Sequence, residues 1–209
     1  MWALATNKKE IHAILNGKKV LIDWTPVTDP GHIVGPMDVV SIPTMSKHYR
    51  ILPWQGRRGL AVREIDEQHA KWKLLIVENK TIVRGGDIQV NCSYGVNFLL
   101  RKESKYQSKF DDPKTFVTRG SVKYDLTENK VLDYFPLHEG CPVLVTSGVN
   151  TGRWGYLQAF EKRIGKNRSI ASIKTLDGSV FITALENIVV IGSKEPVIQE
   201  YQKDISAAA

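Results

Sequence analysis

The chain has 209 residues, 42% of them hydrophobic and 24% charged, which is enough to bury a core in one large domain or in two to three small ones. No apolar run approaches the roughly 20 residues that cross a bilayer, and the N-terminus lacks the apolar region of a signal peptide, so we expect no membrane segment. The net charge of +7 favours a polyanionic partner, nucleic acid before membrane. Cys92 and Cys141 lie far apart in apolar surroundings, which indicates buried reduced thiols and a reducing, cytoplasmic compartment.

Residues 1–46 predict a short helix followed by strands. The helix is expected from Asn7 to Leu15, capped by Asn7 together with Glu10 and stopped by Gly17. Strands are expected at 20–24 and 37–42, on either side of a loop rich in proline and glycine. One short helix on a pair of strands is marginal at this size, so we expect a further N-terminal element or another domain to cover it.

Residues 47–136 predict a β domain with one helical turn, capped by Asp66 and running to Trp72. A hairpin is expected from 122–126 and 131–135, turning near Asn129, which tolerates the left-handed region. Residues 101–114 are polar and rich in lysine, as expected for a surface loop that follows a phosphate backbone. The other expected strands are 50–52, 59–65, 74–77, 88–92 and 97–100.

Residues 137–192 predict a third module, which opens with two strands around a loop that contains Gly148, Gly152 and Gly155. The loop is expected to display Arg153 and Trp154 at its tip, where a cation beside an aromatic ring suits a phosphate or a base face. An alternative in which Trp154 packs back onto its own module stays open.

A basic turn at 162–168 follows, then strands at 170–176, 180–184 and 187–191. Asp177-Gly178 is a strong hairpin signal between the first two of these strands. Five short strands with tight turns predict a small barrel, and residues 193–209 read as a polar tail with a short helix.

Motifs for catalysis or metal binding are absent from the sequence. Neither a phosphate-binding glycine loop nor a nucleophile elbow occurs. Asp111-Asp112 suits a turn, and Asp38 suits local backbone hydrogen bonds. The histidines share no ligand spacing; they are His12, His32, His48, His69 and His138. We therefore expect a protein that is not an enzyme and holds no metal or cofactor.

Several motifs, in the same order, resemble the S4e family of eukaryotic and archaeal small-subunit ribosomal proteins over nearly the whole chain. These motifs lie at 3–4, 20–23, 37–42, 59–62, 71–74, 145–155 and 187–192. The resemblance implies an RNA-binding module of the S4 type at 1–46, a central family-specific β domain at 47–136, a KOW-type barrel at 137–192 and a tail at 193–209. It implies a mostly β, α+β fold overall. Family members carry a basic extension and a first helix before the point where this chain begins, so the first module is expected to be shortened.

The charge and the resemblance together predict a structural constituent of the small ribosomal subunit that binds rRNA without catalysis. Its expected partners are an 18S-type rRNA and neighbouring small-subunit proteins, with no membrane and no small-molecule substrate. The expected location is the cytoplasmic ribosome, with nucleolar assembly in a eukaryote. The residues expected to contact RNA are Lys8, Lys9, Lys18, Lys19, Trp54, Arg57, Arg58, Lys71, Lys73, Lys102, Lys105, Arg153, Trp154, Lys162, Arg163, Lys166 and Arg168.

Two alternatives come from other classes of protein. An extra-ribosomal regulatory factor is one, since KOW barrels resemble those of transcription elongation factors. An RNA-modifying enzyme is the other, since S4-type modules occur in pseudouridine synthases, but no segment supplies a catalytic domain with a placed aspartate.

Overall fold

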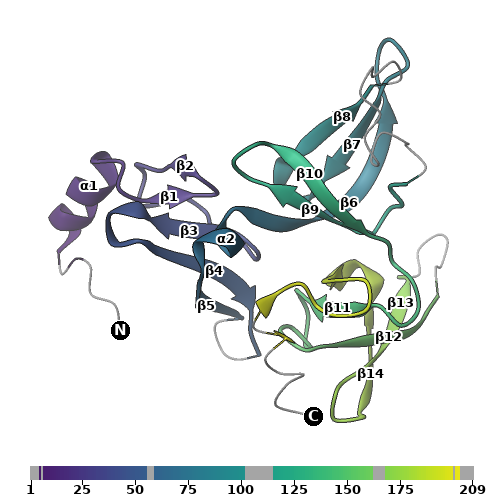
Figure 1. Cartoon of the computed structure of the whole chain (residues 1–209). Helices are drawn as coiled ribbons and strands as arrows, with labels where there is room; N and C mark the ends of the chain where they lie inside the picture. Colours follow the sequence, from purple (N-terminus) through teal and green to yellow (C-terminus); the bar gives the residue numbers. More distant parts are fainter. Residues whose placement is uncertain are drawn as a thin grey trace. The chain divides into compact units, whose positions relative to one another are not determined.

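The computed structural model describes residues 5, 7–55, 59–101, 115–161, 168–199 and 201–202. These residues form three five-stranded sheets and two α-helices, which confirms the expectation of a mostly β, α+β fold (Figure 1). The chain divides into two compact units, Met1–Lys73 with Asp125–Lys130 and Leu74–Tyr124 with Val131–Ala209.

Helix α1 (Lys8–Asn16) begins with the predicted capping box, in which the Asn7 side chain and the Glu10 side chain satisfy each other's backbone N–H groups. Its C-terminal end differs in detail from the prediction. Gly17 has an ordinary φ of −71°, whereas Lys18 takes the left-handed conformation with φ 53°. The N–H of Lys18 bonds to Leu15 O at 2.8 Å and that of Lys19 to Ile14 O at 3.3 Å, the two bonds of a Schellman motif.

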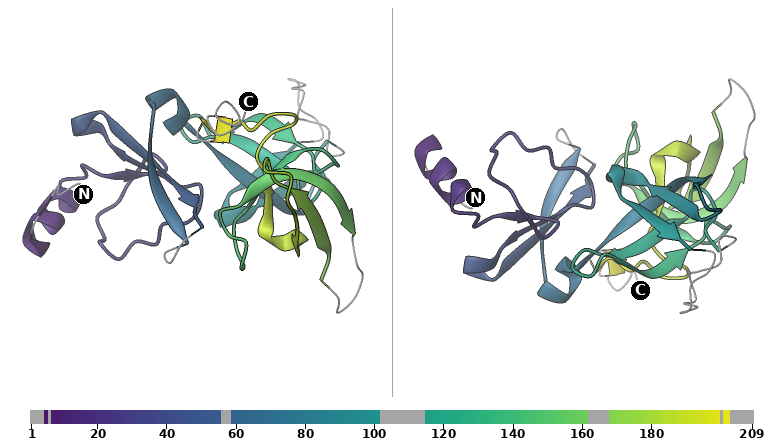
Figure 2. Two further views of the ribbon diagram at one scale, coloured as in Figure 1. Left: turned by 90° about the horizontal axis from the view of Figure 1, so that it is seen from below. Right: turned by 90° about the horizontal axis from the view of Figure 1, so that it is seen from above.

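Helix α1 buries none of its residues, and Ile11 on its apolar stripe is 39% exposed. The helix lies at the margin of the first unit, beside the hairpin of β1 and β2 (Figures 1 and 2).

The first sheet has the order β2-β1-β3-β4-β5 and is antiparallel throughout. Its strands are β1 (Leu21–Ile22), β2 (Thr25–Pro26), β3 (Val39–Ile42), β4 (Lys47–Pro53) and β5 (Leu60–Ile65). Val39 pairs with Arg50 and Ile42 with Lys47, so the sheet continues past residue 46, where the first module was expected to end. Helix α2 (Glu67–Ala70) follows β5, and buried Val39, Ile65 and Ala70 form a core cluster against which Leu126 packs.

The second sheet has the order β10-β9-β6-β7-β8. Its strands are β6 (Trp72–Ile82), β7 (Ile88–Cys92), β8 (Asn97–Leu100), β9 (Ser121–Asp125) and β10 (Lys130–Phe135). The ring of Phe116 is fully buried and meets Phe98 and Tyr134 edge to face, with centroids 5.3 Å and 5.1 Å away. Asn129 turns the β9–β10 hairpin with φ 55°, as predicted.

The third sheet has the order β14-β13-β12-β11-β15, so β14 and β15 are its two edges among the described residues. Its strands are β11 (Pro142–Val145), β12 (Trp154–Glu161), β13 (Ile170–Lys174), β14 (Val180–Ala184) and β15 (Ile188–Val190). The core contains all four residues of β11, together with Leu157, Ala171 and Ile173.

Three short 3₁₀ turns complete the described part: Pro43–Met45, Ser93–Gly95 and Leu185–Asn187. Both cysteines are free and buried, Cys92 at the end of β7 and Cys141 just before β11. The predicted burial of the two thiols is therefore confirmed.

Candidate nucleic-acid interface

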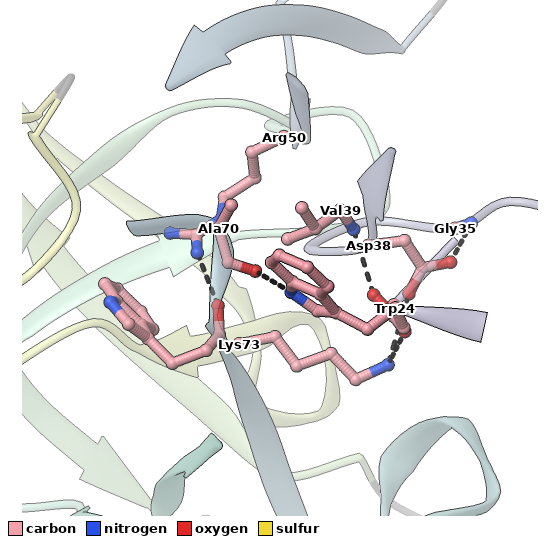
Figure 3. A network of polar contacts seen from close by, with 9 residues as sticks. Trp24, Gly35, Asp38, Val39, Arg50, Ala70 and Lys73 are labelled. Carbon is pink, nitrogen blue, oxygen red and sulfur yellow. Dashed lines mark hydrogen bonds and ion pairs between the residues drawn. The ribbon is translucent and has the colours of Figure 1, made fainter. Parts of the chain in front are cut away.

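The first unit is organised by a polar network around the corner of the β1–β2 hairpin (Figure 3). Asp23 and Trp24 form this two-residue corner with φ 49° and 63°, the signs that a type I′ turn requires. Such a turn normally takes Asn-Gly, so other contacts must hold these two residues. Asp23 exchanges hydrogen bonds with the Val39 backbone, donating at 2.9 Å and accepting at 3.0 Å, while Trp24 Nε1 donates to Ala70 O at 3.0 Å.

Lys73 joins this network as a buried cation between two carboxylates. Its Nζ makes a short ion pair with Asp23 and lies 3.4 Å from Asp38 Oδ1, and the lysine is only 4% exposed (Figure 3). Asp38 also accepts a hydrogen bond from the Gly35 N–H at 2.7 Å, as expected from the sequence. Burial raises the pKa of Asp38, and the hydrogen bond from Gly35 and the charge of Lys73 only partly oppose it.

This burial corrects the prediction that Lys73 contacts RNA. Its ammonium is already held by two carboxylates inside the unit, so it is not available to a phosphate. Arg50 has a similar internal role, since Nη2 donates to His69 O at 2.7 Å and Trp72 O at 2.6 Å, and its guanidinium lies 4.2 Å from the Trp72 ring centre (Figure 3).

Helix α1 presents four of the predicted cations. Lys8 and Lys9 occupy its first turn, Lys18 and Lys19 follow its last, and all four are exposed. The Schellman motif fixes the backbone that carries Lys18 and Lys19, so these two side chains leave the helix end from defined positions.

Trp54 lies just beyond β4 and is 50% exposed. The guanidinium of Arg63 on β5 lies 4.9 Å from the centre of its ring, a cation–π contact that was not predicted from the sequence. Lys71 is exposed but forms an ion pair with Glu67 at 3.2 Å. Surface pairs of this kind are weak and exchange readily, so Lys71 stays among the predicted phosphate contacts.

The loop before β12 differs from the expected arrangement. Arg153 and Trp154 lie at the start of β12, where Val145 N–H bonds to Arg153 O at 2.9 Å, and the tip is formed by Val149, which is 99% exposed. The prediction that Arg153 and Trp154 occupy the tip is therefore wrong, because pairing with β11 continues to Gly152, whose N–H bonds to Val145 O at 2.8 Å.

Both side chains have partners within the second unit. Arg153 stacks on the Phe181 ring at 4.2 Å and hydrogen bonds to Asn150 at 3.3 Å and to Ser179 at 3.4 Å. Trp154 is half-buried and packs against Tyr156 and Tyr201, with ring centroids 6.4 Å and 5.5 Å away. The contact with Tyr156 follows the alternative that the sequence left open, whereas Tyr201 lies in the segment that was expected to be a polar tail.

Asn187 anchors this loop and was not recognised from the sequence. Its backbone oxygen accepts from Thr146 N at 2.8 Å and its side-chain oxygen accepts from Ser147 Oγ at 2.8 Å. The two ends of this second bond are 40 positions apart in the chain, and no local pattern marks it.

Among the remaining predicted cations, Arg168 is described and exposed. The others lie outside the described residues; they are Arg57, Arg58, Lys102, Lys105, Lys162, Arg163 and Lys166. Exposed cations that were not predicted as RNA contacts include Arg63, Arg84, Lys174 and Lys194. They stand singly in the chain, whereas the prediction relied on clusters of cations.

Within the described ranges, no group of three or more His, Cys, Asp or Glu side chains could hold a metal ion. No helix in the same part of the chain is long and apolar enough to cross a membrane.

The fold and the surface define a class: a basic, mostly β protein with three sheets, whose exposed cations in the described residues lie on helix α1, on strands and in turns. Residues 45–131 match the family model described as ribosomal family S4e. Small ribosomal subunit protein eS4 of Desulfurococcus amylolyticus is 34% identical over 199 residues, which cover 95% of this chain and 77% of that protein. The chain belongs to the ribosomal S4e family, as its motifs predicted.

Two further relatives define the extent of the similarity. The eS4 protein of Staphylothermus marinus is 37% identical over 171 residues, which cover 79% of this chain and 64% of that protein. This chain therefore spans somewhat less than two thirds of the length of that relative. The crystal structure of the 30S ribosomal protein S4e from Thermoplasma acidophilum is 24% identical, with a TM-score of 0.69, and covers 89% of this chain and 88% of that one, which supports the fold.

Proposed function

We propose that this protein is a structural constituent of the small ribosomal subunit that binds rRNA and has no catalytic activity. The observation that carries the proposal is the match to small ribosomal subunit protein eS4 over most of the chain. An 18S-type rRNA and neighbouring small-subunit proteins are its proposed partners, at the cytoplasmic ribosome and, in a eukaryote, during nucleolar assembly.

The proposed modules are those of the family: an S4-type module at 1–46, a central β domain at 47–136, a KOW-type barrel at 137–192 and a tail at 193–209. Binding would depend on many separate phosphate contacts, because the cations are spread over several elements. Lys8, Lys9, Lys18 and Lys19 are the best supported of these contacts, since all four are exposed on one short helix and its end.

The conformation of Lys18 supports this assignment. A left-handed lysine costs roughly 1 kcal/mol relative to glycine, the residue that most often occupies this position of a Schellman motif. A lysine in this conformation, at a position that glycine would occupy at lower cost, supports a functional role for the Lys18 charge.

Trp54 is proposed to stack on an exposed base, with Arg63 behind the ring and the predicted cations Arg57 and Arg58 close to it in the chain. Arg153 is proposed to contribute less to RNA binding, because its guanidinium already hydrogen bonds to Asn150 and Ser179 and would have to contact a phosphate in addition to them.

Sedimentation tests the proposal. The tagged protein, expressed in a cell that uses it, should migrate with small ribosomal subunits in a gradient at moderate salt, and its removal should leave subunits that lack it. Migration only as free protein, or with RNA polymerase, would instead support the extra-ribosomal alternative.

A further inference from the structure

One exposed face of β6, β7 and β8 carries a row of three asparagines, one on each strand. Asn79 pairs with Asn91, and Asn91 pairs in turn with Asn97. The next row on the same face contains Thr81, Gln89 and Leu99. Facing side chains lie about 5 Å apart and the two rows about 7 Å apart, so five uncharged polar groups form one continuous patch. We call these six residues the amide face; its three strands lie side by side in Figure 1.

Hydrogen bonds join four side chains of the amide face and orient three of its amides. Gln89 Nε2 donates to Asn91 Oδ1 at 2.8 Å, and Asn91 Nδ2 donates to Asn79 Oδ1 and, at 3.5 Å, to Thr81 Oγ1. The direction of these bonds leaves the Asn79 amide group as a donor and Gln89 Oε1 as an acceptor. The face thus presents donors and acceptors at set positions before any partner arrives.

The stability of the sheet does not explain these residues. Asparagine is depleted in β-strands, where branched and aromatic residues pack better, yet one row holds three of them. Asn79, Thr81 and Asn97 are exposed, and the core of this sheet lies under Val90 and Leu100, on the other face.

Two arginines lie beyond one end of the amide face. Arg84 is in the turn between β6 and β7, and Arg101 directly follows β8, and both are exposed. They share this end of the sheet, because Ile82 pairs with Ile88 and Ile88 with Leu100. The two arginines can therefore contact phosphates of an RNA whose sugars and bases accept or donate hydrogen bonds at the neighbouring amide face.

We propose that the amide face binds the minor groove of an A-form RNA helix, with its amides on 2′-hydroxyls and base edges and with Arg84 and Arg101 on nearby phosphates. This groove is wide and shallow and displays 2′-hydroxyls, which donate and accept as amides do. A protein partner fits less well, because interface cores favour aromatic residues, and Leu99 is the only large apolar residue among the six. The inference rests on the proposed function and names the RNA feature that one sheet recognises.

The test is the triple variant N79V/Q89V/N91V, since valine is favoured in strands and should preserve the sheet. Binding to protein-free small-subunit rRNA is measured over a range of salt, with unfolding curves to confirm the fold. The affinity should fall about 10-fold or more, with the slope of log affinity against log salt unchanged, because every cation is kept. Competition by an RNA duplex and by a DNA duplex of the same sequence gives a second readout: the wild type should prefer RNA, and the variant should lose that preference.

Gln158→Val is the matched control, because it removes an exposed amide from β12 of another sheet and should leave affinity unchanged. Equal affinity of the wild type and the folded triple variant would overturn the inference and leave the proposed function standing. Absence of rRNA binding by the wild type would overturn the proposed function itself. A triple variant that binds rRNA normally but fails to join small subunits would assign the face to a protein neighbour, and that result also overturns the inference.

Discussion

Among single residues, Asp38 is the clearest case in which burial changes chemistry. It lies in the network with Asp23 and Lys73, and burial raises its pKa above the ordinary value of 3.8. A carboxyl that holds its proton more tightly in the folded state stabilises the fold at low pH. That contribution is complete below the unfolded pKa and is lost as the pH rises through the folded pKa.

The wild type loses stability above about pH 4, because the buried Asp38 carboxyl ionises there, and Asp38→Asn should prevent this loss. Asparagine keeps an oxygen that accepts from Gly35, so the local structure should persist. We expect the free energy of unfolding of the variant, relative to wild type, to increase as the pH rises from about 4 to 7. Urea unfolding at a series of pH values measures it, and a relative stability that falls with pH would contradict this account.

Asp125 contributes to the pH dependence of stability in the opposite direction to Asp38. Burial acts to raise the pKa of Asp125, but hydrogen bonds from Thr127 and Glu128 outweigh burial and lower this pKa. Its contribution is present above the unfolded pKa and lost as the pH falls, but both proteins share it, so it cancels in the comparison.

The ion-pair partners of Lys73 could not be predicted from the sequence. Its place two residues after Lys71 made it part of a predicted basic cluster, yet its partners Asp23 and Asp38 are 50 and 35 positions away. Only the folded first unit brings the three together, since Lys73 lies on β6 of the second sheet and both aspartates lie beside strands of the first. The same holds for Trp24, whose turn conformation depends on contacts with distant backbone rather than on its own preference.

Among the elements, β12 depends on a glycine for a steric reason. A Cβ on Gly155 would overlap the backbone oxygen of Lys174 on β13. Gly155 also pairs with Val143 of β11, so neither neighbouring strand can move away without breaking the sheet.

Gly155→Ala should lower the free energy of unfolding by about 1 to 3 kcal/mol, the usual range for a group forced into a filled space. Gly31→Ala is the control, because its nearest atom, Asp29 Oδ1 at 3.3 Å, ends a flexible side chain. Thermal or urea unfolding compares the two, and equal stabilities would show that β12 and β13 separate at little cost.

Strand bounds were predicted well for three strands that each follow a turn containing glycine. The predicted ranges 88–92, 97–100 and 180–184 equal those of β7, β8 and β14. Strand β6 was predicted only over 74–77 but runs from Trp72 to Ile82, because its polar second half gains its hydrogen bonds from β7. The amide face lies partly in that half, where no hydrophobic alternation marks a strand.

For the whole molecule, the cations behind the +7 charge are spread along the sequence and do not form one long basic run. If these cations contact RNA, each of them releases counterions on binding, and the salt dependence of the affinity counts them.

The variant K8A/K9A/K18A/K19A should therefore bind small-subunit rRNA more weakly and with a flatter dependence of log affinity on log salt, by about 0.7 to 0.9 for each phosphate that the variant no longer neutralises. Lys130→Ala is the control, since Lys130 is an exposed lysine that pairs with Glu128 at 3.0 Å in a hairpin turn. A slope equal to that of the wild type would remove helix α1 from the proposed interface.

The two buried thiols also give the second unit a pair of internal probes of its opening. Cys92 belongs to the second sheet and Cys141 directly precedes the first strand of the third, and they are 4% and 0% exposed. Burial, together with the charge of Glu78, raises the pKa of Cys92 to about 12, and burial raises the pKa of Cys141. Because only an accessible thiolate reacts with a thiol reagent, each labelling rate under native conditions reports how often its own sheet opens.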